Sequence, residues 1–337
     1  MSANCSRACV WVVGVAALAG VGVSETRAAA QDLLVSTFTG HSVSRFDGAT
    51  GAYLGEFVTP GSGGLRKADG ICFGPDGNLY VGDSAGMENP NTPGTVIRYN
   101  GRTGAFIDTF ASGGELYVPW DLAFGPDGNL YVSSSYRSWV SRYNGTTGAF
   151  IDYFVPDGSG GLSGPNGILF RGDYLYVATA SDPSDPFGRV LRYSALTGAF
   201  VDEFIPPLSG GLKVPAFMTF GPDGNLYVTG WSSYAVHRYN GTTGAFVDLF
   251  VPPGTLSNPA GLAFGPDGNL YVASWGNSRV QRYDGTTGAF LGTFASFTAP
   301  NRPWSIVFTP EPGTLALLGA GVVGVAVRRR RSAWAWW

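Results

Sequence analysis

Short apolar runs separated by tight turns recur along residues 31–309. In the copy at 261–272, an apolar run is followed by Gly-Pro-Asp-Gly and then by Asn-Leu-Tyr-Val. Proline presets φ for a turn and glycine takes its left-handed position, so this segment predicts a tight hairpin between two strands. A third run, Val-x-Arg-Tyr, then an Asn-Gly or Asp-Gly turn, and a fourth run, Ala-Phe-(Ile/Val/Leu), complete a unit of four short strands.

The spacing of these units predicts the architecture. The tyrosine of the second strand recurs every 44 to 51 residues, the period of a four-stranded propeller blade, at Tyr80, Tyr131, Tyr176, Tyr227 and Tyr271. The chain begins with the last three strands of a unit, at 32–57, and ends with a lone first strand, at 304–308. We therefore predict an all-β, six-bladed β-propeller with four-stranded blades, in which the last blade is assembled from both ends and leaves no open sheet edge.

The repeated phrase resembles that of NHL-repeat propellers and, more distantly, that of gluconolactonase and regucalcin-like six-bladed propellers. The resemblance extends over nearly all of residues 31–309. Such propellers include enzymes, ligand binders and protein-binding scaffolds, so the resemblance implies the fold and leaves the activity open.

The N-terminal segment, residues 1–30, predicts a signal peptide. Arg7 precedes an apolar run at 10–23, and the small residues Ala28 to Ala30 follow it. The run is too short for an ordinary membrane-spanning helix and fits a segment removed by signal peptidase, with cleavage after Ala30. We expect the remaining protein to be exported.

The C-terminal segment, residues 310–337, predicts a sorting tail. Pro310, Glu311 and Pro312 precede a short apolar stretch at 314–327, predicted to be transmembrane, and a basic cluster follows this stretch. The basic cluster is Arg328, Arg329, Arg330 and Arg331, which favours the cytoplasmic side of a membrane. This order resembles the PEP-CTERM sorting signal of Gram-negative bacteria. The resemblance implies transient anchoring in the inner membrane, processing by an exosortase, and delivery to the outer surface or the extracellular matrix.

Charge and residue content exclude several kinds of function for residues 31–309. This segment has 15 basic and 22 acidic side chains, which argues against nucleic acid as a partner. Cys72 is its only cysteine, so no disulfide can form within it. His41 and His237 are its only histidines and fall on different blades, and there is no phosphate loop or cofactor fingerprint. We therefore assign no catalytic residue and expect no required cofactor.

Comparison of the blades separates scaffold from candidate site. Residues that recur from blade to blade indicate scaffold, such as the aspartates of the first hairpin turn, present in four blades, and the arginines of the third strand, present in all six. We expect the former to form turns and the latter to pair with aspartates of the fourth strand. The turns after the first and third strands are nearly uniform and share one face, the turn face. The other connections vary and share the opposite face, the loop face, where we expect a site.

One variable column lies at the start of the first strand, where the central channel opens on the loop face. Its members are Asp69, Trp120, Asn166, Ala216, Ala260 and Trp304. Asp121 follows in a column that is mostly glycine. The resemblance to gluconolactonases implies a metal here held by one Glu, two Asn and one Asp, of which only Asn166 and Asp69 have counterparts. Asp69, Asp121 and Asn166 nevertheless offer oxygen ligands for a calcium ion.

Aromatic side chains are the other candidate for binding on the loop face. We predict a ligand site formed by Trp120, Tyr136, Trp231, Trp275 and Trp304, which lie among small polar residues and suit a sugar or a protein partner. The alternative is that about half of these rings only pack between blades. We favour a binding or structural module acting on polysaccharide or on an envelope protein. A metal-dependent lactonase or hydrolase and a scaffold without any small ligand remain open.

Overall fold

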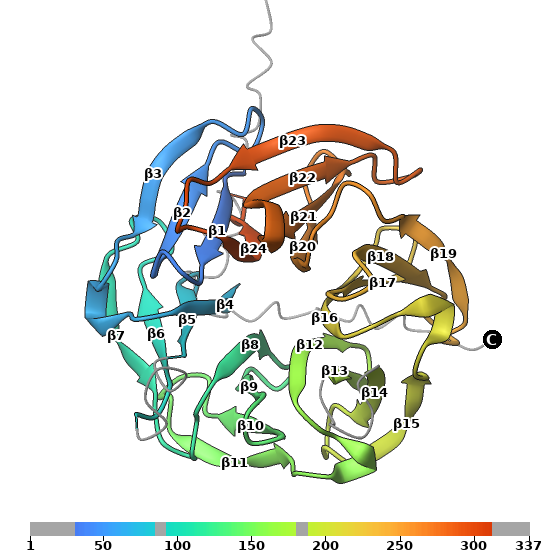
Figure 1. Ribbon diagram of the computed structural model, residues 1–337. Coiled ribbons are helices and arrows are strands. Elements are labelled where there is room, and N and C mark those ends of the chain that lie inside the picture. The colour runs from blue at the N-terminus through green and yellow to red at the C-terminus, as the bar shows by residue number, and fades with distance from the viewer. Residues whose placement is uncertain (1–30, 85–91, 180–187, 312–337) are drawn as a thin grey trace, which may run out of the picture.

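The computed structural model describes residues 31–84, 92–179 and 188–311. These residues form six antiparallel sheets of four strands each, arranged around a central axis (Figure 1). We number the blades from the one that contains both chain ends: blade 1 (β24-β1-β2-β3), blade 2 (β4 to β7), blade 3 (β8 to β11), blade 4 (β12 to β15), blade 5 (β16 to β19) and blade 6 (β20 to β23). The predicted fold is confirmed.

The strands follow one order from the axis outward in every blade. The innermost strands are β24 (Pro303–Phe308), β4 (Ala68–Phe73), β8 (Pro119–Phe124), β12 (Pro165–Arg171), β16 (Pro215–Phe220) and β20 (Pro259–Phe264). The second strands are β1 (Leu33–Thr37), β5 (Leu79–Asp83), β9 (Leu130–Ser134), β13 (Tyr174–Thr179), β17 (Leu226–Gly230) and β21 (Leu270–Ser274).

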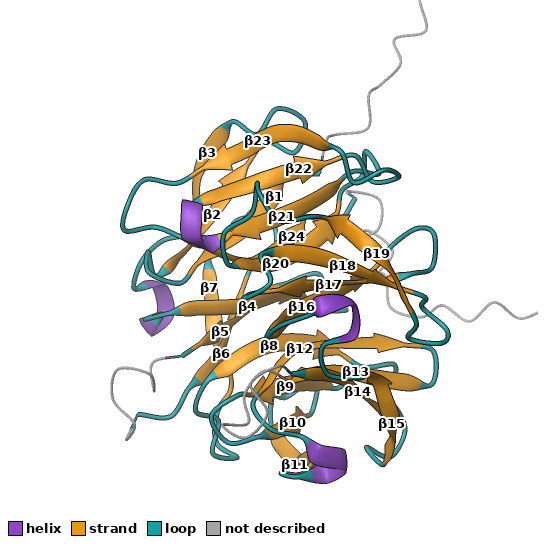
Figure 2. Ribbon diagram, turned by 45° about the vertical axis from the view of Figure 1, so that its right-hand side comes forward, coloured by secondary structure: helices purple, strands orange, loops and turns teal. Residues whose placement is uncertain are grey.

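The outer half of each blade completes the sheet. The third strands are β2 (Ser42–Phe46), β6 (Thr95–Tyr99), β10 (Trp139–Tyr143), β14 (Arg189–Ser194), β18 (Ala235–Tyr239) and β22 (Arg279–Tyr283). The outermost strands are β3 (Tyr53–Val58), β7 (Phe106–Ala111), β11 (Phe150–Val155), β15 (Phe200–Ile205), β19 (Phe246–Val251) and β23 (Phe290–Ser296). Among the described residues the helices are single 3₁₀ turns, η1 (Ser62–Gly64), η3 (Ser159–Gly161), η4 (Ser209–Gly211) and η5 (Trp275–Asn277), which lie in connections between strands (Figure 2).

The hairpin aspartates form turns, as predicted. In blade 3 the Asp127 carboxylate accepts hydrogen bonds from the Asn129 backbone N–H at 3.1 Å and from the Tyr131 hydroxyl at 3.0 Å. Gly128 takes a left-handed φ of 76° at the tightest point of this turn. The aspartate therefore fixes both the turn and the tyrosine that follows it on the second strand.

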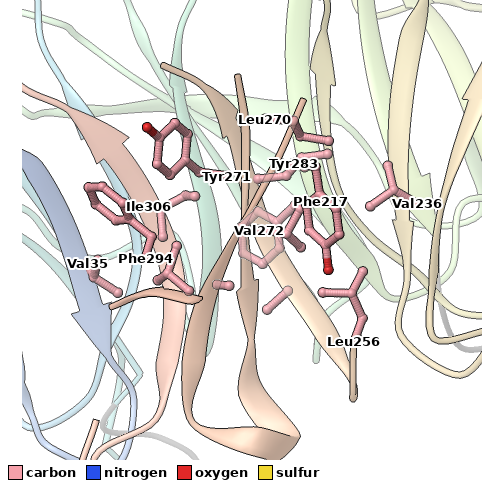
Figure 3. Packing of buried hydrophobic residues seen from close by; sticks show 14 of the residues in the cluster. Val35, Phe217, Val236, Leu256, Leu270, Tyr271, Val272, Tyr283, Phe294 and Ile306 are labelled. Atoms are coloured by element: carbon pink, nitrogen blue, oxygen red, sulfur yellow. The ribbon is translucent and has the colours of Figure 1, made fainter. Parts of the chain in front are cut away.

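The tyrosine column holds neighbouring blades together. Tyr131 is fully buried, and its ring lies 4.9 Å from that of Phe154 in its own blade and 4.7 Å from that of Phe170 in the next. Figure 3 shows the corresponding cluster around Tyr271 and Phe294. Edge-to-face aromatic contacts thus repeat from blade to blade, which explains why the same residue types return at this spacing.

The arginine column forms the predicted cross-strand ion pairs in four blades. In blade 3 the Arg142 guanidinium is bidentate to Asp152, with N···O distances of 3.0 and 2.5 Å. The corresponding pairs are Arg98–Asp108, Arg192–Asp202 and Arg238–Asp248. In blade 1 glycine takes the aspartate position, and Arg45 pairs instead with Asp32 at 2.5 Å.

The two ends of the described chain close the ring. β24 pairs antiparallel with β1, with Leu33 opposite Phe308 and Val35 opposite Ile306. Beyond the strands, the Thr309 N–H donates to the Asp32 carbonyl at 2.8 Å and the Asp32 N–H donates to the Thr309 hydroxyl at 2.9 Å. The predicted closure by both ends is confirmed, and the chain leaves β24 on the turn face.

No helix among the described residues is long and apolar enough to span a membrane. The predicted signal peptide at 1–30 and the predicted tail from Pro312 onward, including Arg328 to Arg331, lie outside the described residues.

Candidate functional site at the channel mouth

A cavity of about 250 Å³ lies where the channel opens on the loop face. It is formed by the starts of innermost strands and by the connections beside them. Its walls are Trp120, Ser135, Asn166, Val214, Ala216, Trp231 and Trp304. Three of the predicted ligand-binding tryptophans therefore line one cavity, although they come from three different blades.

Trp304 lies at the centre of an aromatic cluster. Its side chain is only 5% exposed, and its ring centroid lies 4.9 Å from that of Trp120 and 5.5 Å from that of Trp231. Trp275 adjoins Trp231 at 5.4 Å. The Arg302 guanidinium lies 4.1 Å from the Trp275 ring centroid and adds a positive charge at the edge of the cluster.

Three indole N–H groups of this cluster have no acceptor among the described residues. Among the described residues, none accepts a hydrogen bond from the buried Nε1 atoms of Trp120, Trp275 and Trp304. A buried donor without an acceptor costs about 1–3 kcal/mol, so such groups are rare unless water or a ligand bonds them. The cluster therefore combines flat apolar faces with hydrogen-bond donors that the protein itself does not use.

Tyr136 does not line this cavity, although its neighbour Ser135 does. The Tyr136 side chain is 71% exposed, and its ring lies 6.1 Å from that of Tyr117. The structure thus brings together four of the five residues predicted to bind a ligand. Trp304 also packs against its neighbours, as the alternative of packing between blades expects.

Asp121 links two blades. Its carboxylate accepts hydrogen bonds from the backbone N–H of Leu122 at 2.9 Å and from that of Ile168, in the next blade, at 3.0 Å. Burial raises the pKa of Asp121 to about 7, although these two hydrogen bonds act in the opposite direction. In the equivalent position of blade 1, the Ser305 hydroxyl accepts from the Ile71 N–H at 3.5 Å. This column therefore joins the innermost strands of adjacent blades.

Glycine occupies three of the six positions in that column, where the next innermost strand lies close. A Cβ on Gly167 would come within 2.6 Å of the Ala216 carbonyl oxygen, and one on Gly261 within 2.7 Å of the Trp304 carbonyl oxygen. The exception in blade 5 is Phe217, whose ring lies 5.9 Å from that of Trp304. Phe217 was missed by the sequence analysis, although its place in a glycine column was a visible signal.

The residues predicted to hold calcium form hydrogen bonds within the protein. The buried Asp69 carboxyl accepts a hydrogen bond from the Ser84 hydroxyl through one oxygen, and no described residue bonds its other oxygen. Burial and the nearby Asp83 charge hold the pKa of Asp69 well above its usual value, which disfavours the charged form. The Asn166 side-chain amide donates to the Pro215 carbonyl at 3.0 Å.

These contacts do not fit a calcium ion held by Asp69, Asp121 and Asn166. Both Asp121 oxygens are already bonded to backbone N–H groups. Within 31–84, 92–179 and 188–311, no three or more His, Cys, Asp or Glu side chains are grouped so that they could hold a metal ion. Calcium binding stays a prediction that the geometry does not favour, and we derive no chemistry from it.

Comparison with known proteins agrees with the fold and the tail. The NHL repeat matches residues 256–283, and the PEP-CTERM protein-sorting motif matches residues 308–331. The chain is an NHL-repeat six-bladed β-propeller with a PEP-CTERM sorting motif. The motif begins within β24 and implies an exported, cell-surface-sorted protein that an exosortase processes.

The comparison with solved structures covers the propeller as a whole. One similar chain comes from a crystal structure of a nidogen/laminin complex, with a TM-score of 0.64 and 15% identity. The match covers 83% of this chain and 99% of that chain. At this identity the likeness concerns the fold alone. No curated protein matches the sequence.

Proposed function

We propose that this propeller is a surface-displayed binding module that holds a sugar ring in the cavity of the channel mouth. The observation that carries the proposal is the aromatic cluster, in which Trp120, Trp231 and Trp304 line a cavity. Two of these, Trp120 and Trp304, have buried N–H groups with no acceptor among the described residues. A pyranose ring has an apolar face of C–H groups and a rim of oxygens. The indole faces suit the former and the indole N–H groups suit the latter.

The size and polarity of the cavity suit a small part of a larger ligand. Its volume of about 250 Å³ lies just below the usual range for drug-sized ligands and is adequate for one sugar residue. Ser135 and Asn166 supply polar atoms beside the rings. The ligand is then an end or a branch of a polysaccharide, which suits a protein of the extracellular polysaccharide matrix.

The position of the cavity supports display at a surface. β24 runs from the cavity to the turn face, where the sorting motif begins, so the cavity lies on the face away from the tail. A protein anchored transiently in the inner membrane of a Gram-negative bacterium, and then released to its outer surface, would present this face outward.

The proposal is tested by binding of full-length protein to extracellular polysaccharide of the source cells, measured by co-sedimentation. Trp231→Ala should weaken binding by at least about ten-fold, since removal of a stacked ring costs more than about 1.4 kcal/mol. Trp139→Ala is the matched control, because Trp139 packs on Tyr153 at 4.4 Å and does not line the cavity. Equal binding by wild type and Trp231→Ala would refute the proposal.

A further inference from the structure

A second cavity, of about 280 Å³, lies at the joint between blade 6 and blade 1. We call it the joint cavity. Its walls include the rings of Phe46, Tyr53 and Phe297 together with Ser44 and Glu56. The two outer strands of blade 1, β2 and β3, and the connection from β23 to β24 meet here, so the joint cavity is separate from the channel mouth.

This joint departs from the other five. At each of those, the connection entering the blade inserts a buried leucine: Leu65, Leu116, Leu162, Leu212 and Leu256. In blades 2 to 5 the same connection accepts a hydrogen bond from the tyrosine that ends the third strand, as when the Tyr99 hydroxyl donates to the Ser62 carbonyl at 2.7 Å. In blade 6 the Tyr283 and Thr255 hydroxyl groups are hydrogen-bonded at 2.7 Å. In blade 1 Phe46 replaces this tyrosine, and Phe297 contacts it at a centroid distance of 5.2 Å. At this joint, phenylalanine side chains therefore stand where the other joints have a buried leucine and a hydrogen-bonded tyrosine.

The joint cavity also contains a carboxylate that is oriented by hydroxyl groups. Glu56 accepts hydrogen bonds from the Tyr53 hydroxyl at 2.8 Å and from the Ser44 hydroxyl at 3.2 Å. Burial and the adjacent Glu56 charge raise the pKa of Tyr53 to about 12, so this hydroxyl keeps its proton and remains a donor. The ion pairs found among the described residues do not include Glu56.

In blade 4 the carboxylate at the position equivalent to Glu56 forms an ion pair. Glu203 occupies the equivalent place on the outermost strand, and Arg189 binds it at 2.9 Å. In blade 1 the equivalent of Arg189 is Ser42, whose hydroxyl instead lies 2.8 Å from that of Thr37. Blade 1 thus has the acidic partner of this pair and lacks the basic one.

We propose that the joint cavity binds the quaternary ammonium group of a small ligand. Glu56 supplies the opposite charge, and the rings of Phe46, Tyr53 and Phe297 supply negative π faces. The polar residues Ser296, Thr298 and Asn301 complete the lining. Phe46 meets Tyr53 at 59° and Phe297 at 67°, so the three rings present angled walls to a rounded group. A quaternary group suits the three rings better than a primary amine does, because it has no N–H groups that need hydrogen-bond acceptors.

The test is a ligand-observed NMR titration of full-length protein with choline. The uncharged isostere of choline, in which tert-butyl replaces trimethylammonium, has nearly the same shape and isolates the role of charge. Choline should bind at least about ten-fold more tightly than the isostere, and Glu56→Gln should remove at least about ten-fold of that affinity. Glu203→Gln is the matched control and should leave choline binding unchanged, as should Trp231→Ala.

Several results would overturn the inference. Equal affinity for choline and for the isostere would identify only an apolar hole, and unchanged binding in Glu56→Gln would place choline elsewhere. No binding of choline at millimolar concentration would also refute it. Unfolding midpoints of Glu56→Gln and Glu203→Gln, measured in parallel, distinguish a lost site from a lost fold. Co-sedimentation with phosphatidylcholine vesicles separates the sources, since a lipid headgroup binds vesicles and a free solute does not.

Discussion

Ile306 offers a direct test of ring closure because it lies in the strand contributed by the far end of the chain. It is 6% exposed and faces Val35 across the β24–β1 pair. Ile306→Ala removes three carbon groups, worth about 2.4 kcal/mol at about 0.8 kcal/mol per buried group. The cavity left behind adds to this transfer cost, so we expect a loss of roughly 3–4 kcal/mol in the free energy of unfolding.

The chain provides its own matched control for this substitution. Ile168 occupies the same column on β12, within a blade of continuous sequence, and is 4% exposed. If β24 is as integral to its sheet as β12 is, Ile306→Ala and Ile168→Ala should agree within about 1 kcal/mol. Urea unfolding of full-length protein measures both. In thermal unfolding we expect each midpoint to fall by roughly 6–12 °C.

The two variants separate two errors in the reasoning. A loss below about 1 kcal/mol for Ile306→Ala, beside a normal loss for Ile168→Ala, would show that β24 does not close the ring. Small losses in both variants would show that this column does not face the core. Only similar and substantial losses agree with the structure.

Two further predictions concern charged groups. Asp121→Ser should reduce the pH dependence of stability between pH about 4 and 8, because the pKa of Asp121 is raised to about 7. The stability that Asp121 contributes is present below pH about 4 and is lost, by at most about 4 kcal/mol, as the pH rises through 7; parallel curves for the two proteins would contradict this. Asp152→Asn should cost less than about 1 kcal/mol in urea unfolding, since the Asp152 side chain is 43% exposed and solvent screens its pairing with Arg142. A cost above about 2 kcal/mol would mean that this ion pair is much stronger than exposed pairs usually are.

The features that the sequence predicted well depend on contacts between adjacent strands. The turn at Asp127 and the pairing of Arg142 with Asp152 involve residues close along the chain, and comparison of the blades was enough to find them. The tryptophans at the channel mouth could be predicted in part, because the starts of all innermost strands converge on the axis. Tyr136 could not be placed, since a single residue in a connection can face either side, and only its neighbour Ser135 faces the cavity.

The features that could not be predicted from the sequence depend on contacts between neighbouring blades. Asp121 bonds to Ile168 because innermost strands approach within contact distance, and the repeat pattern does not give that distance. The joint cavity left two signals, a phenylalanine at position 46 in a tyrosine column and the absence of the usual leucine before β24. These two signals became informative only with the structure, in which the third strand of a blade packs against the connection that enters that blade.

The orientation of β24 has a mechanical consequence. The chain leaves this strand at Thr309 on the turn face, while the channel mouth opens at its other end. A pull on the C-terminal segment that is resisted by a ligand at the mouth therefore acts along the axis of β24. The hydrogen bonds between β24 and β1 lie across that axis, so they would be loaded together in shear and would have to break at once. A peeling force would break them one after another, and the closing strand is not oriented to be peeled.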